Sequence, residues 1–187
     1  SGSYRTYKVD GGTIVKRQEL QVGTFFLADG NLLPKDADAA TVQAAKVVGI
    51  VFQTDPSRIG NAEKNKLGEG NVHGLVMSVK NAATDQRWGP YGKDEGLTKC
   101  TTKAQNYNDI SGYGNCKHIR NTRGSFADYP AFLAANDYNT TCPVPAATTG
   151  WFLPSSGQWW DILQNLGGCP ALADVTEQTS PDSDNFD

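Results

Sequence analysis

The stretch TGWFLPSSGQWWDILQNLGG, residues 149–168, carries the clearest local signals in this chain of 187 residues. Pro154 ends an extended entry, and Ser155 favours the start of a helix because its hydroxyl can accept a free backbone N–H of the first turn. Gln158, three residues later, can reach back to the backbone of Ser155 and complete a capping box. The stretch therefore predicts a well-capped helix that stops at its two final glycines.

The tryptophan pair in this stretch has a structural and a ligand-binding interpretation. Four apolar side chains repeat at the spacing of one helix face: Trp159, Ile162, Leu163 and Leu166. We therefore expect Trp159 to be buried and structural, and Trp160 to point elsewhere. Trp160 would then cover a sheet edge or another layer of the fold, or stack on a ligand if it is exposed.

The composition is that of a loop-rich globular protein, with 38% hydrophobic residues, 20% charged residues, 20 glycines and 9 prolines. A chain of this length can bury a core within a single domain without metal or disulfide staples. The formal net charge of −3 gives no basic footprint, and no apolar run is long enough to span a membrane. We therefore expect no nucleic acid partner and no transmembrane segment.

The first part of the chain predicts β structure. Short runs of β-branched and aromatic residues lie at 11–17 and 23–36, and the Asp29-Gly30 pair inside the second run predicts a hairpin. The continuous apolar run from Val47 to Phe52 predicts a strand buried on both faces. Residues 73–82 predict its neighbour at the centre of the sheet.

The second half predicts little regular structure outside two helices. Residues 57–71 form a polar stretch without apolar periodicity, and residues 83–125 are dominated by Gly, Asn, Thr and Lys. Besides the helix that follows Ser155, a helix is expected after Asp128 as N-cap, with Pro130 in its first turn and an end at residues 136–137.

No pattern in the sequence is typical of a catalytic or metal site. His73 and His118 lie far apart, without the spacing of a zinc or iron site, and the glycines at 111–116 lack the order of a dinucleotide-binding loop. We therefore expect a non-catalytic protein without a metal. One alternative is calcium, because tail acids match the first part of a calcium loop without completing it: Asp182, Asp184 and Asp187.

Aromatic residues in the 83–125 segment are the candidate ligand-binding residues. They lie among small polar residues, a mixture typical of adaptable binding surfaces. The alternative is that they anchor an irregular loop to the core. These candidates are Trp88, Tyr91, Tyr107 and Tyr113.

Several stretches together resemble one family. They are VVGIVFQTD, HGLVMSVKNA, RWGPYGKDEG, SGYGNCKHIRN, YPAFLAANDYNTT and the stretch quoted first. They are similar to bacterial surface domains with a C-type-lectin-like fold, known mostly from gut Bacteroidales and often the terminal module of fimbrial or other surface adhesins. The formylglycine-generating enzyme and the variable proteins diversified by retroelements have related folds.

The resemblance covers residues 44–168 and is strongest at a W-x-L-P-S-x-x-[QE]-W motif. In this chain the motif consists of Trp151, Leu153, Pro154, Ser155, Gln158 and Trp159. The resemblance implies an α+β, C-type-lectin-like fold with a twisted antiparallel sheet, two helices and long irregular loops. It also implies an extracellular location on the bacterial surface, at the outer membrane or on a fimbria.

The resemblance also leads to an expected division of the chain. We expect one domain over 1–187, with an N-terminal β-hairpin region at 1–43, a lectin-like core at 44–168 and an acidic tail at 169–187 that is loose or a loop cut open. In the diversified relatives, an aromatic and polar stretch after the second helix contacts the ligand. This chain stops before such a stretch, so we expect the C-terminal part of the fold to be missing.

These observations lead to one functional hypothesis and two alternatives. We expect a non-catalytic recognition domain of a bacterial adhesin, on a surface or pilus tip, that binds a host or microbial glycan or protein. The first alternative is a structural pilus subunit that contacts pilus or anchor subunits. The second is a formylglycine-generating copper oxidase, which holds copper with a cysteine pair on a flexible strand.

The cysteines disfavour the oxidase. Cys142 and Cys169 are far apart in sequence, and no further cysteine follows Cys169. The four cysteines, which include Cys100 and Cys116, have no C-x-x-C spacing. Three disulfide pairings and four free thiols therefore all remain open.

Overall fold

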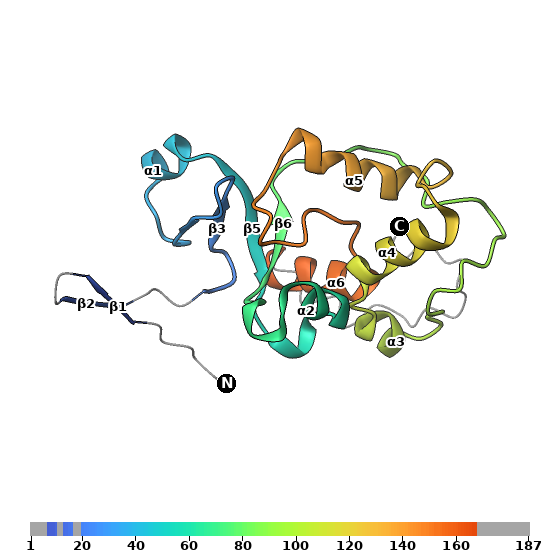
Figure 1. Cartoon of the computed structure of the whole chain (residues 1–187), viewed down its shortest axis with the longest axis horizontal. Coiled ribbons are helices and arrows are strands. Elements are labelled where there is room, and N and C mark those ends of the chain that lie inside the picture. Colours follow the sequence, from blue (N-terminus) through green and yellow to red (C-terminus); the bar gives the residue numbers. More distant parts are fainter. Residues whose placement is uncertain (1–6, 11–12, 17–19, 168–187) are drawn as a thin grey trace.

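The computed structural model describes residues 7–10, 13–16 and 20–167. In this part of the chain β1 (Tyr7–Asp10) pairs with β2 (Thr13–Lys16), and a separate four-stranded sheet has the order β4-β3-β5-β6. All neighbouring strands are antiparallel. Figure 1 shows the sheet toward one end of the molecule and most of the helices toward the other. An α+β architecture with an antiparallel sheet is thereby confirmed.

The four-stranded sheet is built around β5 (Val47–Gln53). It pairs with β3 (Phe25–Leu27) on one side and with β6 (Leu75–Ser78) on the other, so the two predicted central strands are adjacent. β4 (Leu32–Leu33) returns beside β3 through the predicted Asp29-Gly30 turn, where Gly30 has a φ of 86°. Glycine adopts this left-handed conformation without steric cost.

The expectation of two helices is wrong, because the described residues contain six α-helices and two short 3₁₀ turns. They are α1 (Ala39–Ala44), η1 (Pro56–Arg58), α2 (Asn61–Leu67), η2 (Glu69–Asn71), α3 (Lys103–Asn108), α4 (Gly112–Arg123), α5 (Pro130–Thr141) and α6 (Ser156–Asn165). The helices α2, α3 and α4 occupy segments that were expected to be irregular. Periodicity missed them because they bury few apolar side chains: α4 buries only Ile119 and Gly112, and α2 buries Glu63.

The helix expected after Asp128 is present, with different ends. α5 has Tyr129 rather than Asp128 at its N-cap, and Pro130 occupies its first turn as predicted. The helix continues through residues 136–137 to Thr141. Asn136 and Asp137 do not end it because both side chains are exposed, where a helix tolerates polar residues.

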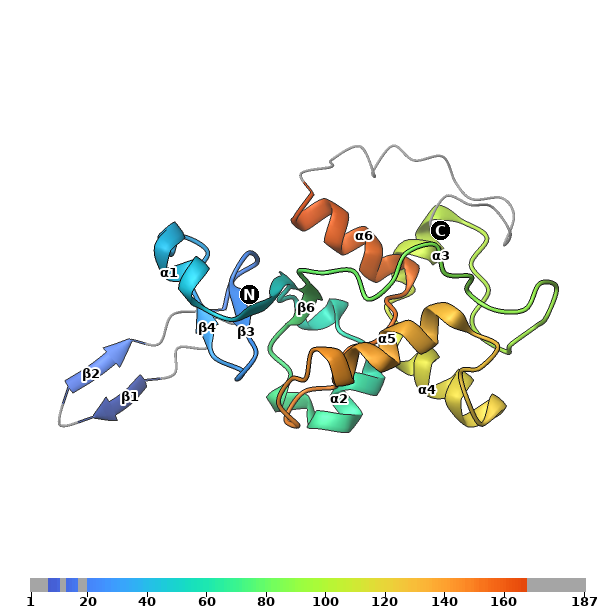
Figure 2. The ribbon, with the colours of Figure 1, turned by 90° about the horizontal axis from the view of Figure 1, so that it is seen from above.

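Two apolar clusters form the core on either side of an extended segment at 151–154. Phe152 packs against the first cluster, and Leu153 packs against the second, because successive side chains of an extended chain point in opposite directions. Figure 2 shows α6 on one side of this segment and α4 and α5 on the other. The first cluster comprises Phe52, Ile59, Leu75 and Ile162, and the second comprises Ile119, Phe126, Tyr129 and Phe132.

The predicted burial of Trp159 is wrong, whereas Trp160 covers another layer of the fold as expected. Trp159 is 40% exposed and Leu163 39%, whereas Trp160 is only 4% exposed and packs edge-on against Tyr107, with ring centroids 5.4 Å apart. Ile162 is buried as expected. The apolar pattern was misleading because the helix turns two polar residues inward, and their partners come from other elements. These residues are Gln158 and Asp161.

Asp161 forms a buried ion pair with Arg58. The Arg58 Nε donates to Asp161 Oδ2 at 3.1 Å, and Gln53 Nε2 donates to the same oxygen at 2.9 Å. Arg58 also donates to the backbone oxygens of Tyr107 at 2.7 Å and Gly157 at 3.2 Å. These contacts connect β5, η1, α3 and α6.

The expected capping box at the start of α6 is confirmed. The Gln158 Oε1 accepts the Ser155 N–H at 3.0 Å, and the Ser155 hydroxyl donates to the Asp109 carbonyl at 2.6 Å. Gly157 donates its N–H to the same carbonyl at 2.8 Å. A side chain at Gly157 would overlap the carbonyl oxygens of Tyr107 and Asp109, so this close approach requires glycine.

Asp161→Asn is expected to lower the free energy of unfolding by about 3 kcal/mol, because it leaves the buried Arg58 charge uncompensated. Urea denaturation of the two proteins measures the difference. Asp36→Asn, at an exposed position, is the matched control and is expected to change stability by less than about 0.5 kcal/mol. Equal stability of both variants would contradict this role of Asp161.

Candidate functional site

The structure does not bring the four predicted aromatic residues to one surface. Tyr107 is half-buried, with its ring centre 3.8 Å from the Arg58 guanidinium and its edge against Trp160, so it anchors α3 to α6. Trp88 is 45% exposed and packs edge-on against Phe132, with ring centroids 5.1 Å apart. Tyr91 is fully exposed, and Tyr113 lines a pocket elsewhere. A ligand contact by any of the four stays a prediction.

Glu95 attaches the irregular segment between β6 and α3 to the helical part of the molecule. This buried carboxylate accepts the Tyr129 hydroxyl at 2.5 Å and pairs with Arg123 at the end of α4. Burial by itself raises the pKa of Glu95, but the hydrogen bonds from Tyr129 and Arg123 outweigh it and hold the pKa below its usual range. His118 adds a 2.7 Å contact to the Glu95 backbone oxygen. Glu95 is therefore a structural anchor of this loop.

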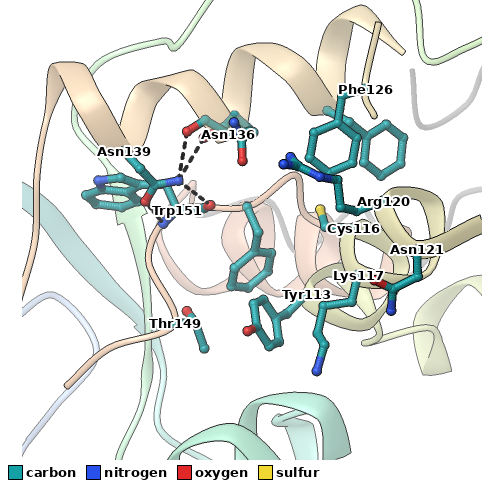
Figure 3. Close-up of a pocket in the computed structure, with 13 residues that line it drawn as sticks. Tyr113, Cys116, Lys117, Arg120, Asn121, Phe126, Asn136, Asn139, Thr149 and Trp151 are labelled. Carbon is teal, nitrogen blue, oxygen red and sulfur yellow. Dashed lines mark hydrogen bonds between the residues drawn. The ribbon is translucent and has the colours of Figure 1, made fainter. Parts of the chain in front are cut away.

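An open pocket of about 210 Å³ lies between α4, α5 and the segment at 149–152. Figure 3 shows its labelled side chains converging from these three parts of the chain. Its lining combines aromatic rings, amides and two cations, and it contains no carboxylate. The lining residues are Tyr113, Cys116, Lys117, Arg120, Asn121, Phe126, Phe132, Ala135, Asn136, Asn139, Thr149, Trp151 and Phe152.

One wall of the pocket is the extended segment that carries the W-x-L-P-S motif. Asn139 of α5 accepts the Trp151 N–H at 2.7 Å and donates to the Trp151 carbonyl at 3.0 Å. The Trp151 indole N–H donates to the Cys142 carbonyl at 2.8 Å. Phe152 then packs against Tyr113, with ring centroids 5.7 Å apart. The motif thereby positions an aromatic wall.

The opposite wall carries positive charge. Lys117 and Arg120 are exposed on α4, and the Arg120 guanidinium lies 5.3 Å from the Phe126 ring centre. The ammonium of Lys66 from α2 lies 5.6 Å from the Tyr113 ring centre, and that of Lys117 lies 5.7 Å from it. Among the residues described, none of these three cations forms an ion pair. The positive charge is therefore available to a ligand.

Glu63 on α2 is a buried acid that the sequence analysis missed. Its side chain is 1% exposed, and neither carboxylate oxygen has a hydrogen-bond partner in the described part of the chain. Burial raises the pKa of Glu63, and the Glu63 charge contributes to a raised pKa of Tyr113, whose main cause is its own burial. No local signal marks Glu63, because its helix lacks an apolar stripe.

Glu63→Gln is expected to raise the melting temperature relative to the unchanged chain, and more so at pH 8 than at pH 4. The folded-state pKa of Glu63 lies above the unfolded value of about 4.3. The stability that this carboxyl contributes is thus present below that value and is lost as pH rises through the folded-state pKa. Glutamine cannot ionise and avoids this loss.

Thermal unfolding followed by circular dichroism at pH 4, 6 and 8 measures this difference. Glu69→Gln, on the exposed turn η2, is the control and is expected to show no growing difference with pH. An identical Tm difference at all three pH values for Glu63→Gln would show that its ionisation is not coupled to folding.

The cysteines and acids considered in the sequence analysis are only partly described. Cys100, Cys116 and Cys142 are not bonded to one another, and burial raises the pKa of the Cys116 thiol to about 11. Cys169 and the tail acids Asp182, Asp184 and Asp187 lie outside the described residues, as does the 169–187 tail. Within those described, no group of three metal-ligating side chains is found.

Comparisons with known proteins were made for the whole chain. No family model matches it. The chain is 27% identical over 187 residues to a putative fimbrium tip subunit, Fim1C, of Bacteroides ovatus; the match covers 84% of this chain and 35% of that protein. A crystal structure of a fimbrial protein from Bacteroides ovatus matches with a TM-score of 0.50 and 22% identity, over 84% of this chain and 39% of that chain.

These similarities support the fold, but they cover only part of the length of each matched protein. The match to the crystal structure shows a shared fold over most of this chain. The chain spans about a third of the length of the curated relative. Among the described residues, none of the helices combines the length and the apolar character that a membrane crossing requires.

Proposed function

We propose that this chain is a non-catalytic recognition module of a bacterial fimbrial adhesin that binds a glycan or protein outside the cell. The observation that carries the proposal is the open pocket at Tyr113, lined by aromatic rings and by cations that form no ion pair with any described residue. Binding pockets typically combine apolar and aromatic walls with a few convergent polar groups. The similarity to a protein named as a fimbrium tip subunit supports the location.

The proposal includes the fold family and the surroundings of the module. We place it among C-type-lectin-like domains, on a fimbria or at the outer membrane, with host or microbial glycans or proteins as ligands and pilus or anchor subunits as neighbours. The sequence resemblance at the W-x-L-P-S motif supports this assignment, and the segment that carries the motif lines the pocket with Trp151 and Phe152. No metal takes part in the proposed binding.

A structural pilus subunit is the second candidate, and one observation favours it. Trp159 and Leu163 lie one helical turn apart on α6, and both are exposed. A neighbouring subunit that covers them would bury apolar surface. Sedimentation velocity at increasing protein concentration tests this candidate, because a structural subunit is expected to assemble without any soluble ligand.

Tyr113→Ala is expected to weaken binding to a printed glycan array and to mucin-coated surfaces by about tenfold, because the variant removes an aromatic face from the lining of the pocket. Biolayer interferometry on the same surfaces gives the affinities. Tyr91→Ala is the control, since Tyr91 is fully exposed and is not among the residues that line the pocket.

The two variants separate the possible outcomes. Loss of binding in Tyr113→Ala alone supports the pocket, and loss in Tyr91→Ala alone would move the binding surface to the loop between β6 and α3. Absence of binding to both surfaces together with concentration-dependent assembly would favour the structural subunit.

A further inference from the structure

The charge of the pocket is opposite in sign to the charge of the whole chain. The chain has a formal net charge of −3, whereas the pocket lining contains Lys117 and Arg120 and no aspartate or glutamate. Lys66 adds a third cation beside Tyr113. A concave site lined by charge of one sign concentrates ligands of the opposite sign. The pocket therefore favours an anion.

Within the part of the chain that the structure describes, much of the hydrogen-bonding capacity of these cations is unused. Lys66 donates to the Thr149 carbonyl at 3.2 Å, which leaves two of its three ammonium protons free. The guanidinium of Arg120 forms no hydrogen bond to any described residue, so its planar donors can engage a carboxylate in a two-point contact. Arg58 and Arg123, in contrast, are paired with acids.

The remaining lining indicates a ring-shaped polar ligand rather than a simple ion. The Tyr113 ring is half-buried, and its face can pack against the C–H groups on one side of a sugar ring, because an aromatic face carries partial negative charge. The exposed amides of Asn121 and Asn136 line the pocket and can pair with hydroxyl groups, although one N–H of Asn136 donates to Asp137 Oδ1 at 3.2 Å. The Asn139 amide already forms hydrogen bonds with the Trp151 backbone.

The size of the pocket agrees with a small saccharide. Its volume of about 210 Å³ is below the range of about 300–1,000 Å³ for sites that enclose a drug-sized ligand. The pocket is also open to solvent, and Lys117 in its lining is exposed. One or two sugar units can therefore occupy it while the rest of a longer chain stays outside.

We infer that the pocket between α4 and α5 binds an acidic saccharide, with the sugar carboxylate on Arg120 and Lys117 and the sugar ring against Tyr113. This inference rests on the proposed recognition function and names the class of its ligand. Such a saccharide can contain hexuronic acid or sialic acid units. Both kinds of unit present a carboxylate on a polar ring.

The test compares acidic and neutral saccharides of matched shape with the full 187-residue chain. Trigalacturonic acid is titrated beside its neutral methyl ester, and 3′-sialyllactose beside lactose, by isothermal titration calorimetry at low and high salt. At least one acid is expected to bind about tenfold more tightly than its neutral partner, because it adds charge-assisted hydrogen bonds. Salt is expected to reduce the difference.

Two variants locate the carboxylate. Arg120→Gln and Lys117→Gln are each expected to weaken acid binding about tenfold and to leave neutral sugars unaffected. Both side chains are exposed, so the fold is expected to persist, and circular dichroism checks this. Lys46→Gln removes an exposed lysine that is not part of the pocket lining and is the matched control, with no expected loss.

The outcomes distinguish this inference from the proposed function. Equal binding of acidic and neutral forms that is lost in Tyr113→Ala would overturn the acidic ligand and keep the recognition pocket. Acid binding that survives both Arg120→Gln and Lys117→Gln would also overturn the inference. Absence of binding to every saccharide tested, while Tyr113 remains necessary for binding to mucin-coated surfaces, would overturn the acidic ligand alone; absence on all surfaces would overturn both.

Discussion

The buried ion pair between Arg58 and Asp161 is the interaction on which the helical half of the molecule depends. A buried charge pair is tolerated only when further hydrogen bonds satisfy both groups, and here Gln53 and the carbonyls of Tyr107 and Gly157 complete the set. Because these partners come from β5, α3 and α6 itself, the pair fixes α6 against the sheet. The first turn of α6 then binds the α3–α4 connection through the Asp109 carbonyl.

The extended segment at 151–154 connects α6 to the pocket, because it directly precedes the helix and lines the pocket. Its alternating side chains enter the two apolar clusters, and Asn139 holds its backbone against α5. The pocket is therefore built on rigid elements: α4 supplies the cations and Tyr113, while the clamped segment supplies Trp151 and Phe152. A recognition site on such a frame loses little conformational entropy when a ligand binds. The extended segment at 151–154 thus both packs into the two apolar clusters and forms one wall of the proposed site.

Prediction from sequence succeeded where a local signal and the tertiary environment agree. The run from Val47 to Phe52, the Asp29-Gly30 turn and the Ser155–Gln158 capping box all form as expected. Prediction failed at α2, α3 and α4, which lack apolar stripes and gain their stability from contacts with other elements. It also failed at Trp159, because an apolar pattern cannot reveal that Gln158 and Asp161 have buried partners.

The sequence by itself determined the central strands, the hairpin turn, the start of α6 and the general α+β character, because these depend on neighbours within a few residues. Only the tertiary structure decided which tryptophan is buried, where Glu63 and Glu95 lie, and that Tyr113 meets Lys66, Lys117 and Trp151 around one pocket. Tyr113 and Lys117 lie one turn apart on α4, but Lys66, Tyr113 and Trp151 are separated by tens of residues along the chain. Their proximity follows from packing and buried charge pairing, which have no periodic signature in the sequence.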